Sequence, residues 1–359
     1  MENSKTYLAV PPGETLKELI EDRGMTQKEL ADRLDVSPKH VSELINGKVG
    51  LTEKIALKLE SVLGVSSDFW INLEENYRKT LELVREENEM DEDLKLLSKF
   101  PVSDLQKLGW IPKEKNLVEK VRVLRKFFHV AQLTLIDKDS IAPCIAFRKL
   151  LTTDKSDICA LCWLQKAKDI AYEQTKVQTI ADMDLHGLRS ALNEIRKFSM
   201  KSSKSLPEQL KEFLANYGII LVLLPSFPGS GIHGASFVWK NKIVIALSDR
   251  NKDADRFWFS LFHEIGHILN GDVWRDSACF SEELEQAANQ FARNCLIKPE
   301  EYKMFLENPA SMNKNYILDF ANKLGITPGI LVGRLQFDNE IPFNKMNQLK
   351  NKINFTHDD

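Results

Sequence analysis

One segment in the last third of the chain, residues 255–269, is apolar on nearly every side when drawn as a helix. A helix without a polar face must be buried all round, so the chain needs a domain large enough to surround it. Asn270-Gly271 supplies the stop signal for this helix. His263 and His267, four residues apart, project from the same face. Because buried imidazoles need polar partners, this face is a candidate site.

The spacing His263-Glu264-Ile265-Gly266-His267 indicates a metal-binding helix. Two neutral imidazoles one turn apart can occupy two corners of a zinc tetrahedron, and the glutamate between them then lies beside the attacking water. We therefore predict His263 and His267 as metal ligands. Glu264 is the predicted general base, which accepts a proton from the water that attacks a peptide bond. Chance yields this pattern on the order of once in a hundred sequences of this length, which disfavours two ordinary core histidines.

A catalytic metal needs a third protein ligand, and a second helix between Ser281 and Pro299 offers one. Glu285 and Asn289, one turn apart, flank its apolar stripe, so we predict Glu285 as the third ligand and Asn289 as the residue that orients a ligating histidine. Glu282 is the alternative ligand, whereas Glu283 is expected to be a first-turn charge. Two histidines and one glutamate can accept zinc or manganese. The expected apolar stripe consists of Leu284, Ala287, Ala288, Phe291, Ala292 and Cys295.

The hydrophobic period changes at Tyr217, where helical spacing gives way to short runs of Ile, Val, Phe and Leu. Three strands are predicted at 219–224, 235–239 and 243–247, and Lys240-Asn241-Lys242 joins the last two as a hairpin. We predict a multidomain protein. Its ranges are a helix-turn-helix domain over 1–78, an α-helical connector and candidate dimerisation region over 79–216, an α+β domain with a small sheet over 217–340, and a frayed polar tail over 341–359.

The N-terminal domain is expected to be all-helical and to contain a helix-turn-helix. Residues 26–34 form one amphipathic helix, Asp35-Val36-Ser37 forms the turn, and Ser37 caps the next helix, which has Pro38 at its first position. This arrangement is also a common packing solution without DNA. If it binds DNA, the second helix enters the major groove. The predicted contacts are Lys39, His40, Glu43 and Asn46 to bases, and Gln27, Ser37 and Lys48 to phosphates.

Charge limits the kind of nucleic-acid binder that the chain can be. The whole sequence has 49 Lys and Arg against 52 Asp and Glu, and residues 1–73 have nine against twelve, so both carry a net charge of −3. Nucleic-acid affinity rests largely on positive charge, which excludes a uniformly basic binder. We expect contact through a few lysines, weak binding by a monomer, and a dimer on a palindromic site.

Cysteine usage and apolar runs suggest a compartment. Five cysteines, an odd number, argue for reduced thiols, and Cys159-x-x-Cys162 lacks a second pair at zinc spacing, so both are interpreted as core residues. The same interpretation applies to Cys144, Cys279 and Cys295. The longest apolar run, 218–224, is far shorter than the ~20 residues of a membrane span, and the N-terminus lacks a signal pattern. We expect a cytoplasmic protein with no membrane partner.

Two parts of the chain resemble known families. Pro12-Gly13-Glu14, the stretch SELINGK at 42–48 and the pattern at 56–77 closely resemble HigA-type antitoxins of the Xre repressor class. The His263–His267 motif, with EQAANQFA at 285–292, resembles the ImmA/IrrE metallopeptidase family over about 217–340. This second resemblance implies a zincin-like domain in which His263, His267 and Glu285 hold zinc and Glu264 is catalytic. The family has asparagine or aspartate at the position of Asn289, so this chain lacks the negative charge that an aspartate would place beside the ligands.

The two resemblances imply a function when they are combined. Members of the second family cleave helix-turn-helix repressors, so we expect a DNA-binding regulator fused to a zinc endopeptidase that cleaves a repressor, an antitoxin or the chain itself. The expected partners are operator DNA and a protein substrate, with a toxin and a second copy of the chain as further candidates. The alternative is a non-catalytic HigA-like antitoxin or repressor whose zinc domain acts as a sensor or a toxin-binding surface.

Overall fold

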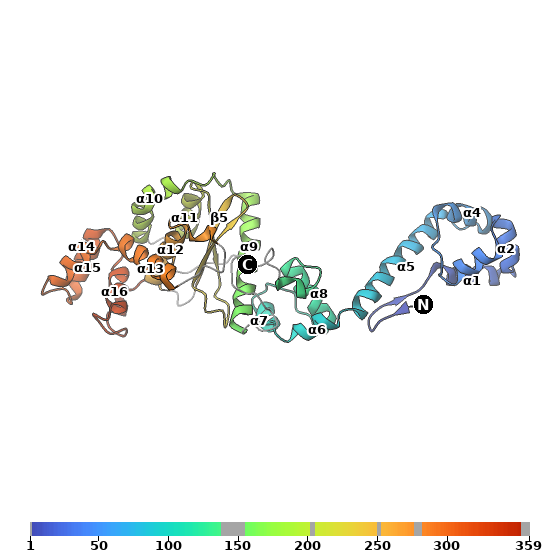
Figure 1. Cartoon of the computed structure of the whole chain (residues 1–359), viewed down its shortest axis with the longest axis horizontal. Coiled ribbons are helices and arrows are strands. Elements are labelled where there is room, and N and C mark those ends of the chain that lie inside the picture. The colour runs from blue at the N-terminus through green and yellow to red at the C-terminus, as the bar shows by residue number, and fades with distance from the viewer. Residues whose placement is uncertain (1, 138–154, 202–204, 250–252, 276–281, 353–359) are drawn as a thin grey trace. The chain divides into compact units, whose positions relative to one another are not determined.

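The structure is a computed structural model that describes residues 2–137, 155–201, 205–249, 253–275 and 282–352. The chain divides into two compact units (Figure 1). Unit 1 comprises Met1–Lys95 and Asn116–Val121, and unit 2 comprises Leu96–Lys115 and Arg122–Asp359. Two helices, α6 (Asp91–Leu97) and α8 (Leu117–Phe128), cross this division. Each unit is described separately because each has its own hydrophobic core.

Unit 1 is a helical domain that begins with a short antiparallel hairpin of β1 (Glu2–Asn3) and β2 (Leu8–Ala9). Its core is formed by large apolar side chains that are almost completely buried, among them Leu30, Leu59 and Trp70. The expected helical domain is therefore confirmed, with the hairpin as an addition. Its helices are α1 (Pro12–Asp22), α2 (Gln27–Leu34), α3 (Pro38–Ile45), α4 (Glu53–Leu63) and α5 (Ser67–Asn88).

The helix-turn-helix consists of α2 and α3, and side-chain caps fix both of its helices. Thr26 Oγ1 accepts a hydrogen bond of 3.1 Å from the Glu29 amide at the start of α2. Ser37 Oγ accepts one of 3.1 Å from the His40 amide at the start of α3, as predicted. Asp35 ends α2 in the left-handed conformation, with φ of 52°. The turn between the helices is thus held by local hydrogen bonds.

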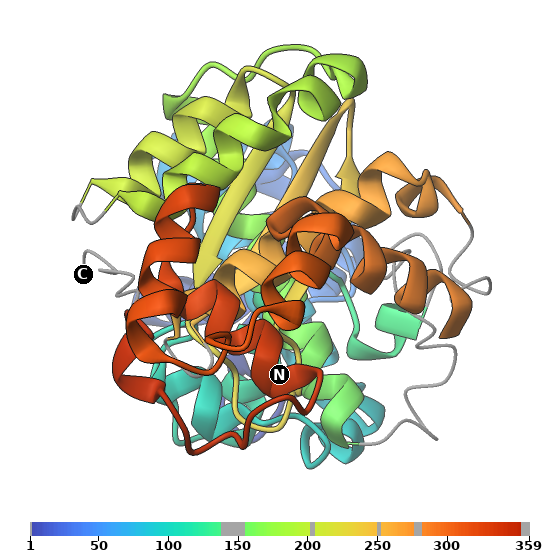
Figure 2. The same ribbon diagram turned by 90° about the vertical axis from the view of Figure 1, so that its left-hand side faces the viewer.

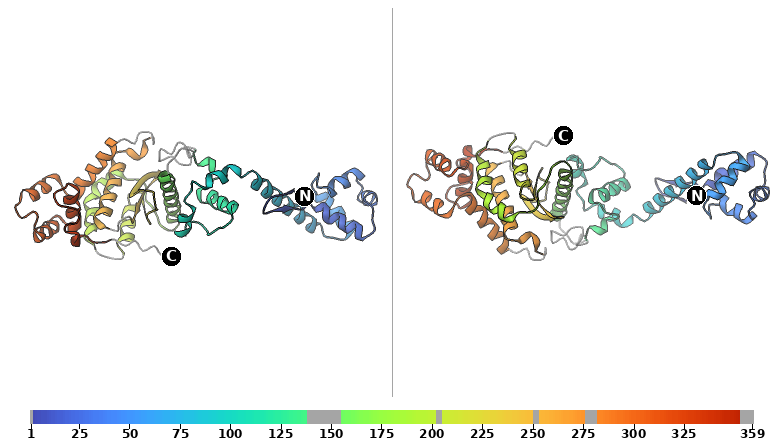
Figure 3. Two further views of the ribbon diagram at one scale, coloured as in Figure 1. Left: turned by 90° about the horizontal axis from the view of Figure 1, so that it is seen from below. Right: turned by 90° about the horizontal axis from the view of Figure 1, so that it is seen from above.

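Unit 2 is built on a three-stranded sheet of β3 (Ile219–Leu224), β4 (Gly234–Trp239) and β5 (Lys242–Ser248) in the order β3-β5-β4. β4 and β5 form the predicted antiparallel hairpin, and β5 also pairs with β3 in parallel. Helix α9 (Lys155–Val177) covers one face of the sheet, and α11 (Leu206–Ala215) and α12 (Ala254–Leu269) cover the other (Figures 1 and 3). Strand β4 is consequently an edge strand of this sheet.

The other elements of unit 2 complete a single large core around α12, whose Leu261, Phe262 and Ile265 are fully buried. The C-terminal helices lie in front of the sheet in Figure 2. The core includes α10 and α11, so the end of the expected 79–216 connector packs with the later domain. The remaining elements are α7 (Val102–Lys107), η1 (Leu133–Asp137), α10 (Leu185–Lys197), η2 (Phe198–Met200), η3 (Asp272–Trp274), α13 (Glu282–Leu296), α14 (Pro299–Glu307), α15 (Lys314–Leu324), α16 (Pro328–Phe337) and η5 (Asn347–Leu349).

The segment at 341–352, which was expected to fray, packs against unit 2. Ile341 and Leu349 join the hydrophobic core, and the Gln336 amide donates hydrogen bonds to the carbonyls of Phe343 (3.2 Å) and Lys345 (2.8 Å). Lys350 Nζ lies 2.7 Å from Asp255 Oδ2 in an ion pair that is almost fully buried. A few apolar and ion-paired anchors outweigh the polar composition here, and residues 353–359 of the expected tail lie outside the described residues.

The described cysteines agree with their interpretation as core residues. Cys159 and Cys162 are buried free thiols and Cys295 is a half-buried one, whereas Cys144 and Cys279 lie outside the described residues. Among the described helices, none combines the length and the apolar character that crossing a bilayer requires.

Candidate metal centre

The candidate site forms where α12 and α13 pack side by side. Gly266 permits this close approach because a Cβ atom there would lie 3.1 Å from Phe291 Cδ1 and 3.3 Å from Ala288 Cα. Both of those residues are on α13, one turn or two beyond Glu285. The glycine between the two histidines therefore has a packing role that the motif alone does not reveal.

Three side chains converge on one point between these helices. The Nε2 atoms of His263 and His267 are 3.0 Å apart. Glu285 places Oε2 at 3.4 Å from His263 Nε2 and Oε1 at 3.4 Å from His267 Nε2. One ligand atom from each of the three residues lies within 4.8 Å of the others. The residues predicted as a ligand set from spacing alone are thus brought together.

Each imidazole is held from behind by an acceptor on its other nitrogen. His263 Nδ1 lies 3.0 Å from Asn289 Oδ1, and His267 Nδ1 lies 2.9 Å from Asp272 Oδ2. An acceptor at Nδ1 favours the tautomer in which Nδ1 carries the proton and the Nε2 lone pair faces the centre. Asn289 occupies the orienting position expected for it.

The donor set fits a cation. Two Nε2 lone pairs and a carboxylate converge, and two neutral imidazoles in this tautomer cannot hydrogen-bond to each other, so the centre calls for a proton or a metal ion. Burial lowers the pKa of His267, but its hydrogen bonds to Glu285 and Asp272 outweigh burial and raise that pKa to about 9. Hydrogen bonds from His263 and His267 hold the pKa of Glu285 well below its usual range. The surroundings therefore stabilise positive charge at this point.

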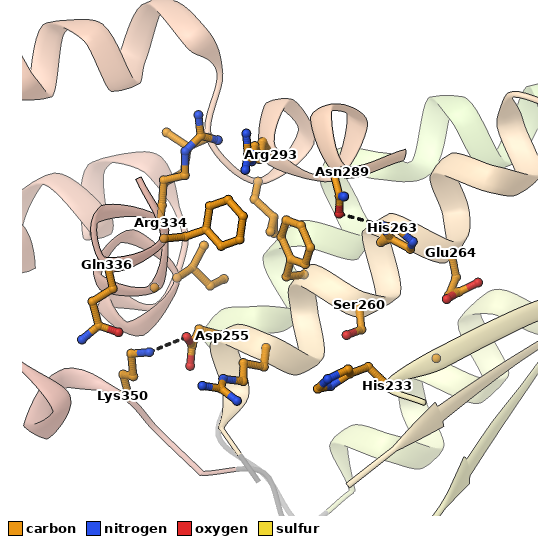
Figure 4. Close-up of a pocket in the computed structure, with 18 of the residues that line it drawn as sticks. His233, Asp255, Ser260, His263, Glu264, Asn289, Arg293, Arg334, Gln336 and Lys350 are labelled. Atoms are coloured by element: carbon orange, nitrogen blue, oxygen red, sulfur yellow. Dashed lines mark hydrogen bonds and ion pairs between the residues drawn. The ribbon is translucent and has the colours of Figure 1, made fainter. Parts of the chain in front are cut away.

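Glu264 is on the same helix but points to a different surface. Its side chain is 5% exposed, and burial raises its pKa, although His263 and a hydrogen bond with Ser236 act in the opposite direction. Figure 4 shows Glu264 turned toward the sheet and His263 turned toward Asn289. At Gly234, the first residue of β4, a Cβ atom would lie 2.8 Å from Glu264 Oε1. Glu264 is thus beside the three converging residues and in contact with the edge strand.

Asp272 is the site residue that sequence reasoning missed. It is 2% exposed and lies in η3, directly after the αL residue Gly271 that follows α12. Helical periodicity cannot place a residue beyond the end of a helix. The only signal was a carboxylate immediately after the Asn270-Gly271 stop signal.

The alternative acidic residues on α13 lie apart from the converging atoms. Glu282 is exposed and accepts a hydrogen bond of 3.3 Å from Gln286, and Glu283 is an exposed first-turn residue. Ala287 is also exposed, although it was expected on the buried stripe, whereas Ala288 and Ala292 are buried. Ser281, expected as the cap of this helix, lies outside the described residues.

A cleft of about 530 Å³ opens onto His263, Glu264 and Glu285. It extends from β4 along α12 and α13 to α16 and the segment that follows α16 (Figure 4). Its walls combine apolar and basic side chains. It can therefore receive a chain segment that carries apolar and acidic side chains. The lining includes His233, Phe259, Ile330, Phe337 and Phe343, together with Arg256, Arg293, Arg334 and Lys350.

The residues predicted to contact DNA all lie on the surface of unit 1. Gln27, Ser37, Lys39, Asn46 and Lys48 are exposed, and His40 and Glu43 are half-buried. Lys39 Nζ lies 3.7 Å from Glu43 Oε1, and the Asn46 amide donates a hydrogen bond of 2.7 Å to the Ser42 carbonyl. Four of the seven residues, Lys39, His40, Glu43 and Asn46, belong to α3 or its C-cap. Their role in DNA contact stays a prediction.

Comparison with known families assigns a class to each unit. Residues 16–70 match the helix-turn-helix family, and residues 216–336 match the IrrE N-terminal-like domain of the M78 peptidases. The chain therefore carries an Xre-type helix-turn-helix domain at its N-terminus and an IrrE/ImmA-like domain in its C-terminal part. Both resemblances drawn from the sequence are confirmed.

Individual relatives each match a short part of the chain. The HTH-type transcriptional regulator YddM of Escherichia coli is 33% identical over 63 residues, which are 18% of this chain and 67% of that protein. Antitoxin HigA-1 of Vibrio cholerae is 46% identical over 66 residues, which are 18% of this chain and 62% of that protein. The solved structure of a HigA-family antidote protein from Coxiella burnetii is 28% identical, covers 23% of this chain and 92% of that chain, and has a TM-score of 0.22. The chain thus spans about two thirds of the length of the two curated relatives.

Proposed function

We propose that the chain is a DNA-binding transcriptional regulator whose second unit is a metal-dependent endopeptidase, and that it cleaves a helix-turn-helix repressor, an antitoxin or a copy of itself. The observation that carries this proposal is the buried Glu264 beside the converging atoms of His263, His267 and Glu285, with Glu264, His263 and Glu285 at the wall of a cleft. The match to a peptidase family supports the same conclusion.

His263, His267 and Glu285 would hold the ion, and zinc is the proposed metal, with manganese as the alternative. When bound, such an ion supplies Lewis-acid polarisation of the scissile carbonyl and lowers the pKa of water. Asp272 and Asn289 keep the two imidazoles in the required tautomer and orientation.

Glu264 is the proposed general base and then the general acid. Its carboxylate accepts a proton from the attacking water and delivers that proton to the nitrogen of the leaving amine. Burial raises its pKa above the ordinary value, which suits a carboxyl group that must hold a proton between these two transfers. Ser236, from β4, hydrogen-bonds to Glu264 and so steadies it between the strand and the ligands.

The edge of β4 is the proposed binding place for an extended substrate segment. Within the described sheet, β4 pairs with β5 on one side only, which leaves backbone donors and acceptors on its other side. A peptide added as another strand would use these groups. Because β4 begins at Gly234, against Glu264, a peptide paired with this strand would pass the general base.

Unit 1 is proposed to bring the peptidase to operator DNA. α3 presents Lys39, His40 and Asn46 on its outer side, and the helix-turn-helix match supports a DNA-binding role. The negative net charge of this region favours weak binding by one copy, so we propose that two copies bind a palindromic site.

A second function has one observation in its favour. The 46% identity with antitoxin HigA-1 over the helix-turn-helix suits a non-catalytic antitoxin or repressor whose second unit senses metal or binds a toxin. The buried Glu264 beside the ligand set favours the enzyme, because neither sensing nor toxin binding requires a general base at that place.

Metal content and cleavage together separate the two functions. The zinc-loaded chain would be incubated with helix-turn-helix repressors encoded beside it, as wild type, as Glu264→Gln, and as Glu283→Gln as an exposed control. We expect cleavage by the wild type and the control, and a loss of about a hundredfold or more in Glu264→Gln with zinc retained. Stoichiometric zinc in the wild type without cleavage of any candidate, or of the chain itself, would instead support the non-catalytic function.

A further inference from the structure

We propose that the cleft contains a carboxylate-recognition subsite centred on Arg293, so that the peptidase selects segments with a carboxylate a few residues from the bond that it cleaves. The inference deepens the proposed peptidase function and rests on it. Three features support it: the position of Arg293 on α13, the contacts of the cleft cations, and the aromatic surface beside them.

Arg293 lies on the same helical face as the candidate ligand. Glu285, Asn289 and Arg293 are spaced at four-residue intervals on α13, and all three line the cleft. Figure 4 shows Asn289 and Arg293 on this helix. Eight residues of helix correspond to about 12 Å along the axis. An extended peptide advances about 3.3 Å per residue, so this separation corresponds to three or four substrate residues. The subsite is therefore within reach of a peptide bound at the metal centre.

The charge of Arg293 is not neutralised within the described part of the cleft. Lys350 pairs with Asp255 at 2.7 Å, Arg334 pairs with Asp338, and Arg256 Nε lies 4.0 Å from Asp253. Arg293, by contrast, makes no ion pair with any described residue, and its Nε is buried without a hydrogen-bond partner among them. Its charge is therefore available to a ligand.

The contact that Arg293 does make leaves its donors usable. The guanidinium carbon lies 4.4 Å from the centroid of the Phe337 ring. A guanidinium stacked on an aromatic face keeps its N–H groups in plane, where they can bind both oxygens of a carboxylate.

An apolar surface borders this position. The side chains of Phe337 and Phe343, both of which line the cleft, are 57% and 61% exposed. Burying such surface favours an apolar substrate side chain next to the carboxylate. The expected recognition element is thus an acidic group with an apolar neighbour.

A purely structural role for Arg293 gives a different expectation. It is in the last turn of α13, where any cation interacts favourably with the helix dipole. Lysine would preserve this interaction but would lose the planar donors and the stacking on Phe337. Arg293→Lys therefore tests recognition separately from helix stability.

The first arm of the experiment measures specificity during cleavage. The zinc-loaded full-length chain would digest a library of random decapeptides, and mass spectrometry would locate each cleaved bond. We expect enrichment of Asp or Glu at one fixed distance of three or four residues from the bond. Arg293→Gln should remove the enrichment, and Arg293→Lys should reduce it with an unchanged melting temperature. Arg256→Gln, which removes a cleft charge already close to Asp253, should keep it.

The second arm measures binding without catalysis. Zinc-loaded Glu264→Gln would be titrated with a pool of fluorescein-labelled, C-terminally amidated decapeptides that contain glutamate, and with a matched pool that contains glutamine instead. We expect about tenfold tighter binding of the glutamate pool, lost in the double variant with Arg293→Gln. A third pool, of the glutamine peptides with free C-termini, completes the arm, and its tighter binding than the amidated glutamine pool would instead identify a terminal carboxylate as the group bound.

The outcomes separate the subsite from the peptidase. Cleavage without any acidic preference, or equal losses in Arg293→Gln and Arg256→Gln, would overturn the subsite and leave the peptidase intact. Discrimination between the two peptide pools without cleavage would support the subsite and count against the peptidase. Equal binding of the two pools would overturn the subsite whatever the result for cleavage.

Discussion

At the scale of single residues, the centre depends on acceptors that do not themselves reach the converging atoms. Asp272 is 2% exposed and holds His267 Nδ1 at 2.9 Å. We expect Asp272→Ala to lower zinc affinity by about 10- to 100-fold, because the imidazole loses the acceptor that fixes its tautomer and orientation. Competition with a chromogenic chelator would measure this, with Glu283→Gln as the control. Unchanged affinity would show that the aspartate does not position the ligand.

The charge state of His267 predicts a pH dependence for metal binding. In the metal-free protein its pKa is raised from 6.5 to about 9, so at neutral pH a proton must leave before a metal binds. We expect apparent zinc affinity to rise about tenfold per pH unit between about pH 6.5 and 9 and then to level off. Chelator competition across this range tests it. An affinity independent of pH would show that no proton is displaced from His267.

The same raised pKa of His267 predicts that the metal-free protein becomes less stable as the pH rises, whereas its metal affinity increases. A pKa raised on folding means that the folded state binds the proton more tightly, so this contribution is fully present below about pH 6.5 and is lost as the pH rises through about 9. Thermal melting of chelator-treated protein should therefore show a falling midpoint across this range, and His267→Gln should remove that part of the fall.

The site residues differ in how far the sequence alone could predict them. His263, Glu264 and His267 followed from a spacing within one helix, because helical geometry fixes which side chains share a face. The placement of Glu285 needed a second helix, and its apolar stripe oriented that helix correctly even though Ala287 proved exposed. Asp272 could not be predicted, because its position depends on how the chain leaves α12 after Gly271.

At the scale of elements, two glycines allow close packing at the site. Gly234 lets β4 approach Glu264, and Gly266 lets α12 approach α13. A Cβ at Gly234 would displace the Glu264 carboxylate, whereas a Cβ at Gly266 would press on α13, which carries Glu285. We expect Gly234→Ala to lower turnover with little change in zinc affinity, and Gly266→Ala to lower zinc affinity. Peptide cleavage at saturating zinc and chelator competition would measure the two effects. Identical profiles for the two variants would contradict these separate roles.

The elements themselves were largely predictable, but their arrangement was not. The largely apolar α12 and the three strands were evident from periodicity, since the hydrophobic pattern reports local structure. The order β3-β5-β4 was not, because pairing between β3 and β5 is a long-range choice that leaves no local signature. The segment at 341–352 is polar on average and still packs, since Ile341 and Leu349 join the core and Lys350 pairs with Asp255.

At the scale of the whole molecule, the two units have separate hydrophobic cores. We therefore expect removal of zinc by a chelator to abolish cleavage and to leave the affinity for operator DNA within about twofold, because no residue of the metal centre belongs to unit 1. Gel-shift titrations with and without chelator would test this. A large change in DNA affinity would reveal coupling between the metal centre and DNA binding.

DNA binding itself is expected to depend on α3. Replacing Lys39 and His40 together by alanine should weaken operator binding about tenfold and reduce the slope of log affinity against log salt by about one. The ion pair of Lys39 with Glu43 is exposed, so its loss should hardly affect folding. Lys79→Ala, an exposed lysine on α5, serves as the control. Binding that survives the double substitution would rule out α3 as the recognition helix.

The ion pair between Lys350 and Asp255 limits where unit 2 can be truncated for expression. The family match ends at residue 336, but Phe343 and Lys350, which lie beyond it, still line the cleft. A fragment ending at 336 would leave the carboxylate of Asp255 buried at the start of α12 without its cation, a costly arrangement. Boundaries for expression are therefore better placed beyond Lys350, the last residue that lines the cleft, than at the end of the sequence similarity.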